Sequence, residues 1–94
     1  MRIVLDRKKA LFIIQNLRLR DLRTFLALAF MAGDEGAGEA TLNSLADQAN
    51  LTILSVSQAL PRLVAFDLIG FKWEVHMGKG AKFGYTVNRK WIEV

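Results

Sequence analysis

The stretch LTILSVSQALPRLV, residues 51–64, decides how this sequence is interpreted. Its apolar residues recur at intervals of three and four, which predicts an amphipathic helix with one side against a core: Val56, Leu60, Leu63 and Val64. Thr52 is a favourable N-cap for this helix, and Pro61 inside it should produce a kink because it removes one backbone hydrogen bond. Arg62 is the only charged residue of the stretch, so the exposed side of this helix is weakly charged.

A shorter helix is predicted immediately before this one. LADQA, residues 45–49, supplies its apolar side, and either Asn43 or Ser44 stands where an N-cap belongs. Asn50 follows, and asparagine tolerates the left-handed backbone conformation that a tight turn requires. The two helices and the turn between them predict a helix-turn-helix over residues 41–67.

Another helix is predicted upstream, at residues 18–32, with Asp21 placed near its positive end. Its apolar residues at helical spacing are expected to face the core: Leu19, Leu22, Leu26, Ala29 and Phe30. GDEGAGEA, residues 33–40, holds three glycines and three carboxylates, which predicts a loop. Thr41 and Leu42 after it could form a very short strand.

Downstream of the helix pair, the pattern changes from helix to strand. FKWEVHM (71–77) and KFGYTV (82–87) alternate apolar and polar side chains, and GKG (78–80) between them is a turn signal. We therefore expect a β-hairpin over residues 70–88, followed by a tail at residues 89–94.

The N-terminal part of the chain gives a weaker signal. RIVL (2–5) and ALFII (10–14) are short apolar runs that could each be a strand or a turn of helix, so residues 1–17 are interpreted as an N-terminal extension. A chain of 94 residues is expected to form one domain, residues 1–94. The expected fold class is α+β, mainly α, with a three-helix core and a C-terminal β-hairpin.

Composition excludes several functional classes. The chain has no Cys and one His, which leaves no disulfide, no Cys-zinc site and no plausible catalytic triad. The carboxylates Asp34, Glu35 and Glu39 lack the spacing of a calcium-binding loop, and GKGAKFG (78–84) lacks the Gly-Lys-Ser/Thr ending of a phosphate loop. The longest apolar run, residues 25–32, is far shorter than the ~20 residues of a membrane span. We expect a soluble, cytoplasmic protein that is not an enzyme and has no cofactor or metal.

Charge is distributed unevenly along the chain, whose net charge is +4. Residues 1–23 hold seven basic and two acidic side chains, and residues 71–94 hold five basic and two acidic. Residues 24–70 between them hold one basic and five acidic. A polyanion should therefore be held mainly by the two ends of the chain.

From Leu19 onward the sequence resembles the winged-helix DNA-binding superfamily. The resemblance lies in LADQANLT (45–52), VSQALPRLV (56–64), DLIGF (67–71) and the hairpin that follows. Regulators of the MarR type and the DNA-binding domains of phage and plasmid replication proteins show this succession of patterns. The resemblance implies a winged helix-turn-helix fold whose second helix lies in the major groove of DNA, with the hairpin as the wing.

The resemblance and the charge distribution together imply two classes of DNA contact. Base contacts would come from the groove-facing side of the second helix: Ser55, Ser57, Gln58 and Arg62. Backbone contacts would come from the N-cap, the wing and the first helix: Thr52, Lys79, Lys82, Arg18, Arg20 and Arg23, with His76 as a further candidate on the hairpin. Gln58 could pair with adenine and Arg62 with guanine, each worth ~1–3 kcal/mol of discrimination when bidentate.

Two functions stay open at this point. The first is a small DNA-binding protein, either a transcriptional regulator or an accessory factor in replication or partition of mobile DNA. It would bind duplex DNA as a homodimer or within a larger assembly, because one such domain offers few phosphate contacts. The second is a protein-interaction or dimerisation module with little affinity for DNA, which the uncharged Ile53, Leu54 and Pro61 favour.

Overall fold

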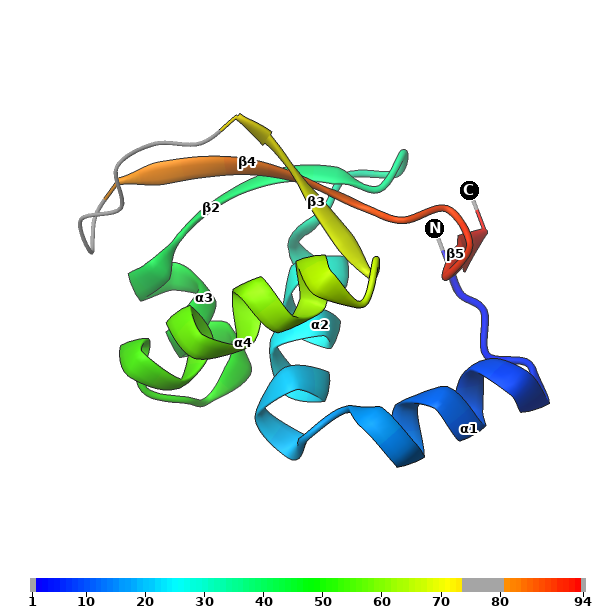
Figure 1. The fold of residues 1–94 in the computed structure, drawn as a ribbon. Coiled ribbons are helices and arrows are strands. Elements are labelled where there is room, and N and C mark those ends of the chain that lie inside the picture. Colours follow the sequence, from blue (N-terminus) through cyan, green and yellow to red (C-terminus); the bar gives the residue numbers. More distant parts are fainter. Residues whose placement is uncertain (1, 74–80, 94) are drawn as a thin grey trace.

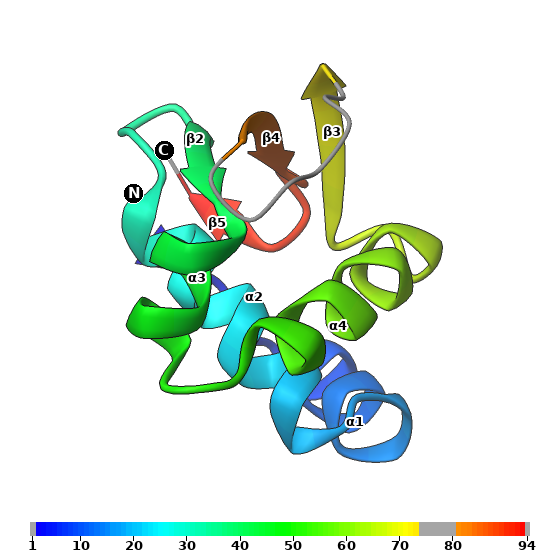
Figure 2. The ribbon, with the colours of Figure 1, turned by 90° about the vertical axis from the view of Figure 1, so that its left-hand side faces the viewer.

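The computed structural model describes residues 2–73 and 81–93 of the chain. Its elements follow in the order β1 (Arg2–Ile3), α1 (Arg7–Asn16), α2 (Leu19–Met31), β2 (Ala37–Thr41), α3 (Leu42–Ala49), α4 (Ile53–Ala65), β3 (Ile69–Trp73), β4 (Lys82–Val87) and β5 (Ile92–Glu93). The helices α2, α3 and α4 pack together on one face of a three-stranded sheet, and α1 extends to one side (Figures 1 and 2). This arrangement confirms the predicted α+β class, which is mainly α.

The sheet is antiparallel, with strand order β2-β4-β3. The strands of the expected hairpin, β3 and β4, pair with each other, whereas residues 74–77 of its first predicted strand and the predicted turn at 78–80 lie outside the described residues. β2 corrects the prediction of a loop at residues 33–40, because Ala37 to Thr41 pair with β4. Gly38 lies opposite Tyr85, and a Cβ atom on Gly38 would come within 2.8 Å of the Tyr85 hydroxyl. The glycine that suggested a loop is therefore what lets this strand pass close to the tyrosine.

The buried side of α2 differs from the predicted one. Leu19, Leu26 and Phe30 are exposed, and only Ala29 of the predicted set is fully buried. The buried residues of the helix are Asp21, Thr24, Phe25, Ala27, Leu28 and Ala29. Apolar residues occur around most of α2, so spacing alone admitted more than one stripe. The contact with the sheet decides which side of α2 is buried, because the Tyr85 hydroxyl on β4 donates to the Leu28 carbonyl at 2.6 Å.

The start of α3 lies earlier than predicted. Thr41 is the N-cap, in place of Asn43 or Ser44, and Leu42 begins the helix instead of ending a strand. The Thr41 hydroxyl accepts from the backbone N–H of Ser44, and the Ser44 hydroxyl accepts from the N–H of Thr41. This reciprocal pair satisfies two N–H groups that the helix start would otherwise leave unpaired.

The turn and the start of α4 agree with the sequence prediction. Asn50 has a left-handed backbone, with φ 55°, and Thr52 caps α4 by accepting from the backbone N–H of Ser55 at 3.1 Å. The buried side of α4 consists of Val56, Ala59, Leu60 and Leu63. Val64, which the pattern had placed in the core, is 38% exposed.

Residues 2–16 form elements of their own, where the sequence predicted only an extension. β1 pairs with β5 near the end of the chain, and Asp6 caps α1 by accepting from the Lys9 N–H at 2.9 Å. This hydrogen bond lowers the pKa of Asp6 below 3.8. No residue of α1 is fully buried, and the helix contacts the body through Phe12, whose ring lies 5.4 Å from Phe66 and 5.9 Å from Trp91.

Candidate nucleic-acid interface

The outward side of α4 is the candidate reading surface. Its exposed residues are Leu54, Gln58, Pro61, Val64 and Ala65. Among these five, only Gln58 has a side chain that donates or accepts hydrogen bonds, whereas Leu54 is apolar and 66% exposed. The surface that α4 offers to a partner is therefore a mostly apolar strip with one amide near its middle.

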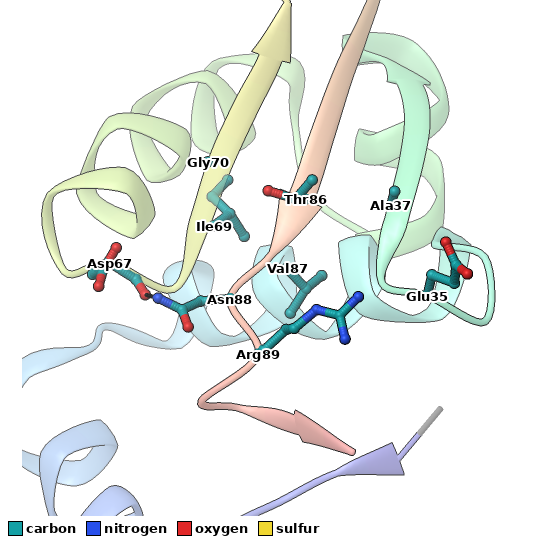
Figure 3. Close-up of a pocket in the computed structure, with 9 residues that line it drawn as sticks. All are labelled: Glu35, Ala37, Asp67, Ile69, Gly70, Thr86, Val87, Asn88 and Arg89. Carbon is teal, nitrogen blue, oxygen red and sulfur yellow. Dashed lines mark hydrogen bonds between the residues drawn. The ribbon is translucent and has the colours of Figure 1, made fainter. Parts of the chain in front are cut away.

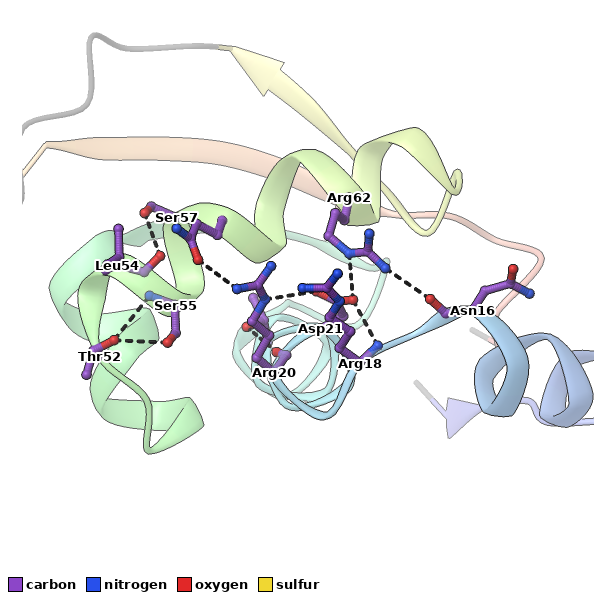
Figure 4. Close-up of polar contacts among 11 residues, drawn as sticks. Asn16, Arg18, Arg20, Asp21, Thr52, Leu54, Ser55, Ser57 and Arg62 are labelled. Carbon is purple, nitrogen blue, oxygen red and sulfur yellow. Dashed lines mark hydrogen bonds and ion pairs between the residues drawn. The ribbon is translucent and has the colours of Figure 1, made fainter.

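The Arg62 side chain forms its contacts with other residues of the protein. Its Nε donates to the Asp21 carboxylate at 2.8 Å, and its Nη2 donates to the Asn16 carbonyl at 3.0 Å (Figure 4). The guanidinium also lies over the ring of Phe66, 5.5 Å from its centre. Arg62 thus joins α4 to the start of α2 and to the end of α1. Its predicted contact with guanine would compete with these three interactions.

Asp21, on α2, is the carboxylate partner of Arg62 in this contact. The residue is 0% exposed, and one carboxylate oxygen accepts both from Arg62 and from the backbone N–H of Arg18 at 3.0 Å. The Arg20 Nε lies 3.8 Å from the second oxygen, which accepts no hydrogen bond from the described residues. The sequence placed Asp21 at a favourable helix end, but it gave no sign that Arg62 would be its partner.

Arg20 links this buried carboxylate to the reading surface. Its Nη1 donates to the Gln58 Oε1 at 2.6 Å. Figure 4 shows the Arg20 side chain extending from α2 toward α4, between Asp21 and the first turns of α4. We call Arg20, Asp21, Gln58 and Arg62 the Asp21 cluster. The structure therefore brings together two predicted base contacts and one predicted backbone contact.

The two serines predicted to contact bases have local partners. The Ser55 hydroxyl lies 3.0 Å from the Thr52 hydroxyl at the start of α4, and the Ser57 hydroxyl donates to the Leu54 carbonyl at 2.8 Å (Figure 4). Both serines are half-buried. Each hydroxyl can still accept a further hydrogen bond, so both stay within the predicted set of contacts.

The predicted backbone contacts do not all lie in one place. Arg18, the N-cap of α2, and Arg23, in its first half, are exposed and lie near Arg20 in the chain. Lys82 is exposed at the start of β4, opposite Thr41, and so lies beside the start of α3. Lys79 and His76 lie outside the described residues.

Two depressions lie away from these residues. One, of about 420 Å³, is lined by apolar residues together with charged side chains of both signs: Glu35, Asp67 and Arg89 (Figure 3). The other, of about 570 Å³, lies beside α1 against Phe12 and Trp91. Neither contains a residue of the predicted DNA contacts.

The described residues show neither a membrane span nor a metal site. No helix in residues 2–73 and 81–93 has the length and apolar character needed to cross a membrane. In the same part of the chain, no three His, Asp or Glu side chains gather as a metal site would require.

Comparison with known proteins supports the fold. No protein-family model matches the chain, and no curated protein matches it in sequence. Among solved structures, the chain is similar to the transcriptional regulator PA4135, with a TM-score of 0.57 and 19% sequence identity. The match covers 84% of this chain and 52% of that chain, so the chain spans about half the length of the regulator. The winged helix-turn-helix fold predicted from the sequence is thereby confirmed.

Proposed function

We propose that this winged-helix protein binds duplex DNA through the exposed side of α4. The observation that carries the proposal is the 2.6 Å hydrogen bond from Arg20 to Gln58. It places the basic start of α2, with Arg18 and Arg23 exposed nearby in the chain, against the polar position of an otherwise apolar helix surface. A helix that offers an amide to base edges beside cations that can meet phosphates combines the two kinds of contact that DNA recognition requires.

The proposal divides these contacts by role. Base contacts are assigned to Gln58, Ser55 and Ser57, while Arg62 contributes mainly by holding α4 against Asp21. Phosphate contacts are assigned to the N-cap, to the start of α2 and to the wing: Thr52, Arg18, Arg20, Arg23, Lys79 and Lys82.

The biological role proposed is that of a small cytoplasmic regulator of transcription, or of an accessory factor in replication or partition of mobile DNA. The similarity in fold to a transcriptional regulator supports the first of these. So few phosphate contacts give weak binding to DNA, so we propose that the protein acts as a homodimer or in a larger assembly.

Binding to random duplex DNA over a series of salt concentrations tests the proposal. We expect the logarithm of the binding constant to fall linearly with the logarithm of the salt concentration, by ~0.9 for each phosphate contacted. Lys82→Ala should reduce that slope by about 1 and weaken binding to all sequences alike. A slope near zero, or no binding at low salt, would reject DNA binding.

A second candidate function is supported by the exposed apolar residues of α4. Leu54 is 66% exposed and Val64 is 38% exposed, with Pro61 between them on the same helix. Such a strip could instead dock a protein partner or a second copy of the chain. Sedimentation at several concentrations tests self-association: Leu54→Ser should dissociate a dimer formed through this surface, and it should leave a dimer formed elsewhere intact.

A further inference from the structure

The orientation of the Gln58 amide is fixed by chemistry. A guanidinium carries only hydrogen-bond donors, so the Gln58 atom that faces Arg20 must be the carbonyl oxygen Oε1. The amide nitrogen Nε2 then lies on the other side of the amide group, away from Arg20. Gln58 is exposed, and Nε2 makes none of the hydrogen bonds recorded among the described residues.

This orientation changes which base the side chain can read. Bidentate pairing of glutamine with adenine uses Oε1 to accept from N6 and Nε2 to donate to N7. Here one of the two lone pairs of Oε1 already accepts from a charged donor at 2.6 Å, a class of hydrogen bond about twice as strong as a neutral one, so only the other lone pair is left for N6 of adenine. Nε2 offers only donors. In the major groove, guanine presents two acceptors side by side, N7 and O6, whereas adenine presents one acceptor beside a donor.

Arg20 in turn lies beside the buried carboxylate. Its Nε lies 3.8 Å from Asp21, which is 0% exposed, and the Arg20 side chain is only 26% exposed. Asp21 is itself fixed by Arg62 at 2.8 Å. The guanidinium that orients Gln58 therefore belongs to an ion-pair network with Asp21 and Arg62, although its Nε forms no hydrogen bond with the described residues.

We infer that Arg20 is a positioning residue that sets base specificity, by turning the Gln58 amide so that α4 selects guanine over adenine. This inference rests on the proposed function, because it requires that α4 meets DNA. It replaces the pairing of Gln58 with adenine expected from the sequence. Arg20 acts through Gln58 and needs no base contact of its own.

Selection from a random duplex library, followed by sequencing of the bound DNA, tests the inference with the full-length chain. Wild type should enrich guanine at a position whose preference disappears in Gln58→Ala. In Arg20→Met the amide is free to turn, so guanine should fall and adenine should rise at that position by about threefold or more. Arg23→Met is the matched control, because it removes one exposed charge from the same helix and should weaken binding without changing the preferred base.

A modified base tests whether Gln58 contacts N7 of guanine, and a second variant separates a change of preference from misfolding. Replacing that guanine by 7-deazaguanine deletes the N7 acceptor and should weaken wild-type binding about three- to tenfold, with no effect on Gln58→Ala. Gln58→Glu keeps an acceptor toward Arg20 but has no donor to offer. It should lose the preference for guanine while its melting temperature stays at or above that of wild type, which separates misreading from misfolding.

The outcomes distinguish this inference from the function on which it rests. Enrichment of adenine by wild type, the same preferred base in wild type and Arg20→Met, or the absence of any position that depends on Gln58 would overturn the inference and leave DNA binding standing. Failure of wild type to bind random duplex DNA at low salt would remove the proposed function itself.

Discussion

The two ends of α2 are held to the rest of the protein by different chemistry. Near its start, the buried carboxylate of Asp21 forms an ion pair with Arg62 of α4 at 2.8 Å. Near its end, the carbonyl of Leu28 accepts a hydrogen bond from the neutral hydroxyl of Tyr85 on β4 at 2.6 Å. We call these the ionic anchor and the neutral anchor of α2.

The two anchors differ in whether they can affect recognition by α4 as well as stability. The ionic anchor reaches the surface, because Arg20 connects Asp21 to the exposed Gln58. The neutral anchor is enclosed, since Tyr85 is 0% exposed and packs within the core. Damage at the ionic anchor should therefore change both stability and any recognition by α4, whereas damage at the neutral anchor should change stability alone.

The largest effect is expected from Asp21→Ala, which breaks the ionic anchor. It removes the acceptor for the Arg18 N–H and leaves the Arg62 guanidinium without its carboxylate partner, which should lower the free energy of unfolding by about 3–5 kcal/mol. The melting temperature should fall by more than about 10 °C. Glu93→Ala is the control, because its ion pair with Arg2 is exposed and should be worth about 1 kcal/mol or less. Equal losses in the two variants would contradict a stabilising ionic anchor.

Gly38→Ala is expected to break the neutral anchor by crowding. The new Cβ would lie 2.8 Å from the Tyr85 hydroxyl oxygen and 3.2 Å from the Ala32 Cα, so the Tyr85 ring or strand β2 must shift. Urea unfolding should show a loss of about 1–3 kcal/mol. In Gly70→Ala the nearest atom, the Thr86 hydroxyl oxygen, is 3.6 Å away, so this control should unfold close to the wild-type midpoint.

Tyr85→Phe tests the neutral anchor through pH. Burial raises the pKa of Tyr85 from 10.0 to about 12, so the unfolded chain loses this proton first. The stabilisation from the neutral phenol is complete below pH 10 and is lost as the pH rises toward about 12. Tyr85→Phe should lose about 1–3 kcal/mol at neutral pH, because the Leu28 carbonyl is left unpaired.

The measurement is urea unfolding of both proteins between neutral pH and pH 12. The difference in unfolding free energy between wild type and Tyr85→Phe should shrink across the alkaline window. A difference that stays constant over the whole range would show that the hydroxyl does not titrate as its burial requires.

Thr52→Ala should give the smallest effect, because Thr52 belongs to neither anchor. It removes the cap that accepts from the Ser55 N–H at the start of α4 and should cost about 1 kcal/mol. Combined with Tyr85→Phe, its effect should add to within about 0.5 kcal/mol, since the two residues share no partner. A clear departure from additivity in thermal or urea unfolding would show that the start of α4 and the neutral anchor are coupled.

Local signals in the sequence predicted much of the helix pair. Thr52 and Asn50 act through their own backbone neighbours, so the cap of α4 and the left-handed turn could be identified without knowing the fold. The choice of the buried side of α2 and the strand β2 depended on Tyr85, which lies 57 residues from Leu28 in the chain. Spacing along one segment carries no information about such a distant partner.

The candidate site was predictable to a similar extent. The resemblance to winged-helix proteins implied the hydrogen-bonding residues on α4, and Gln58 is exposed. That Arg62 would turn inward depends on how α2 crosses α4, because its partner Asp21 lies 41 residues away. The orientation of the Gln58 amide depends on the same crossing through Arg20.

The contacts of α1 with α4 have a consequence for ligand binding at α4. A helix of ten residues is marginal by itself in water. α1 contacts α4 through the Asn16 carbonyl, which accepts from Arg62, and contacts the C-cap of α4 through Phe12, which packs against Phe66. Docking of α1 and the pose of α4 are thus thermodynamically linked. A ligand that favours one pose of α4 must alter the docked fraction of α1, and by reciprocity a molecule that captures α1 must alter the affinity at α4 by the same factor.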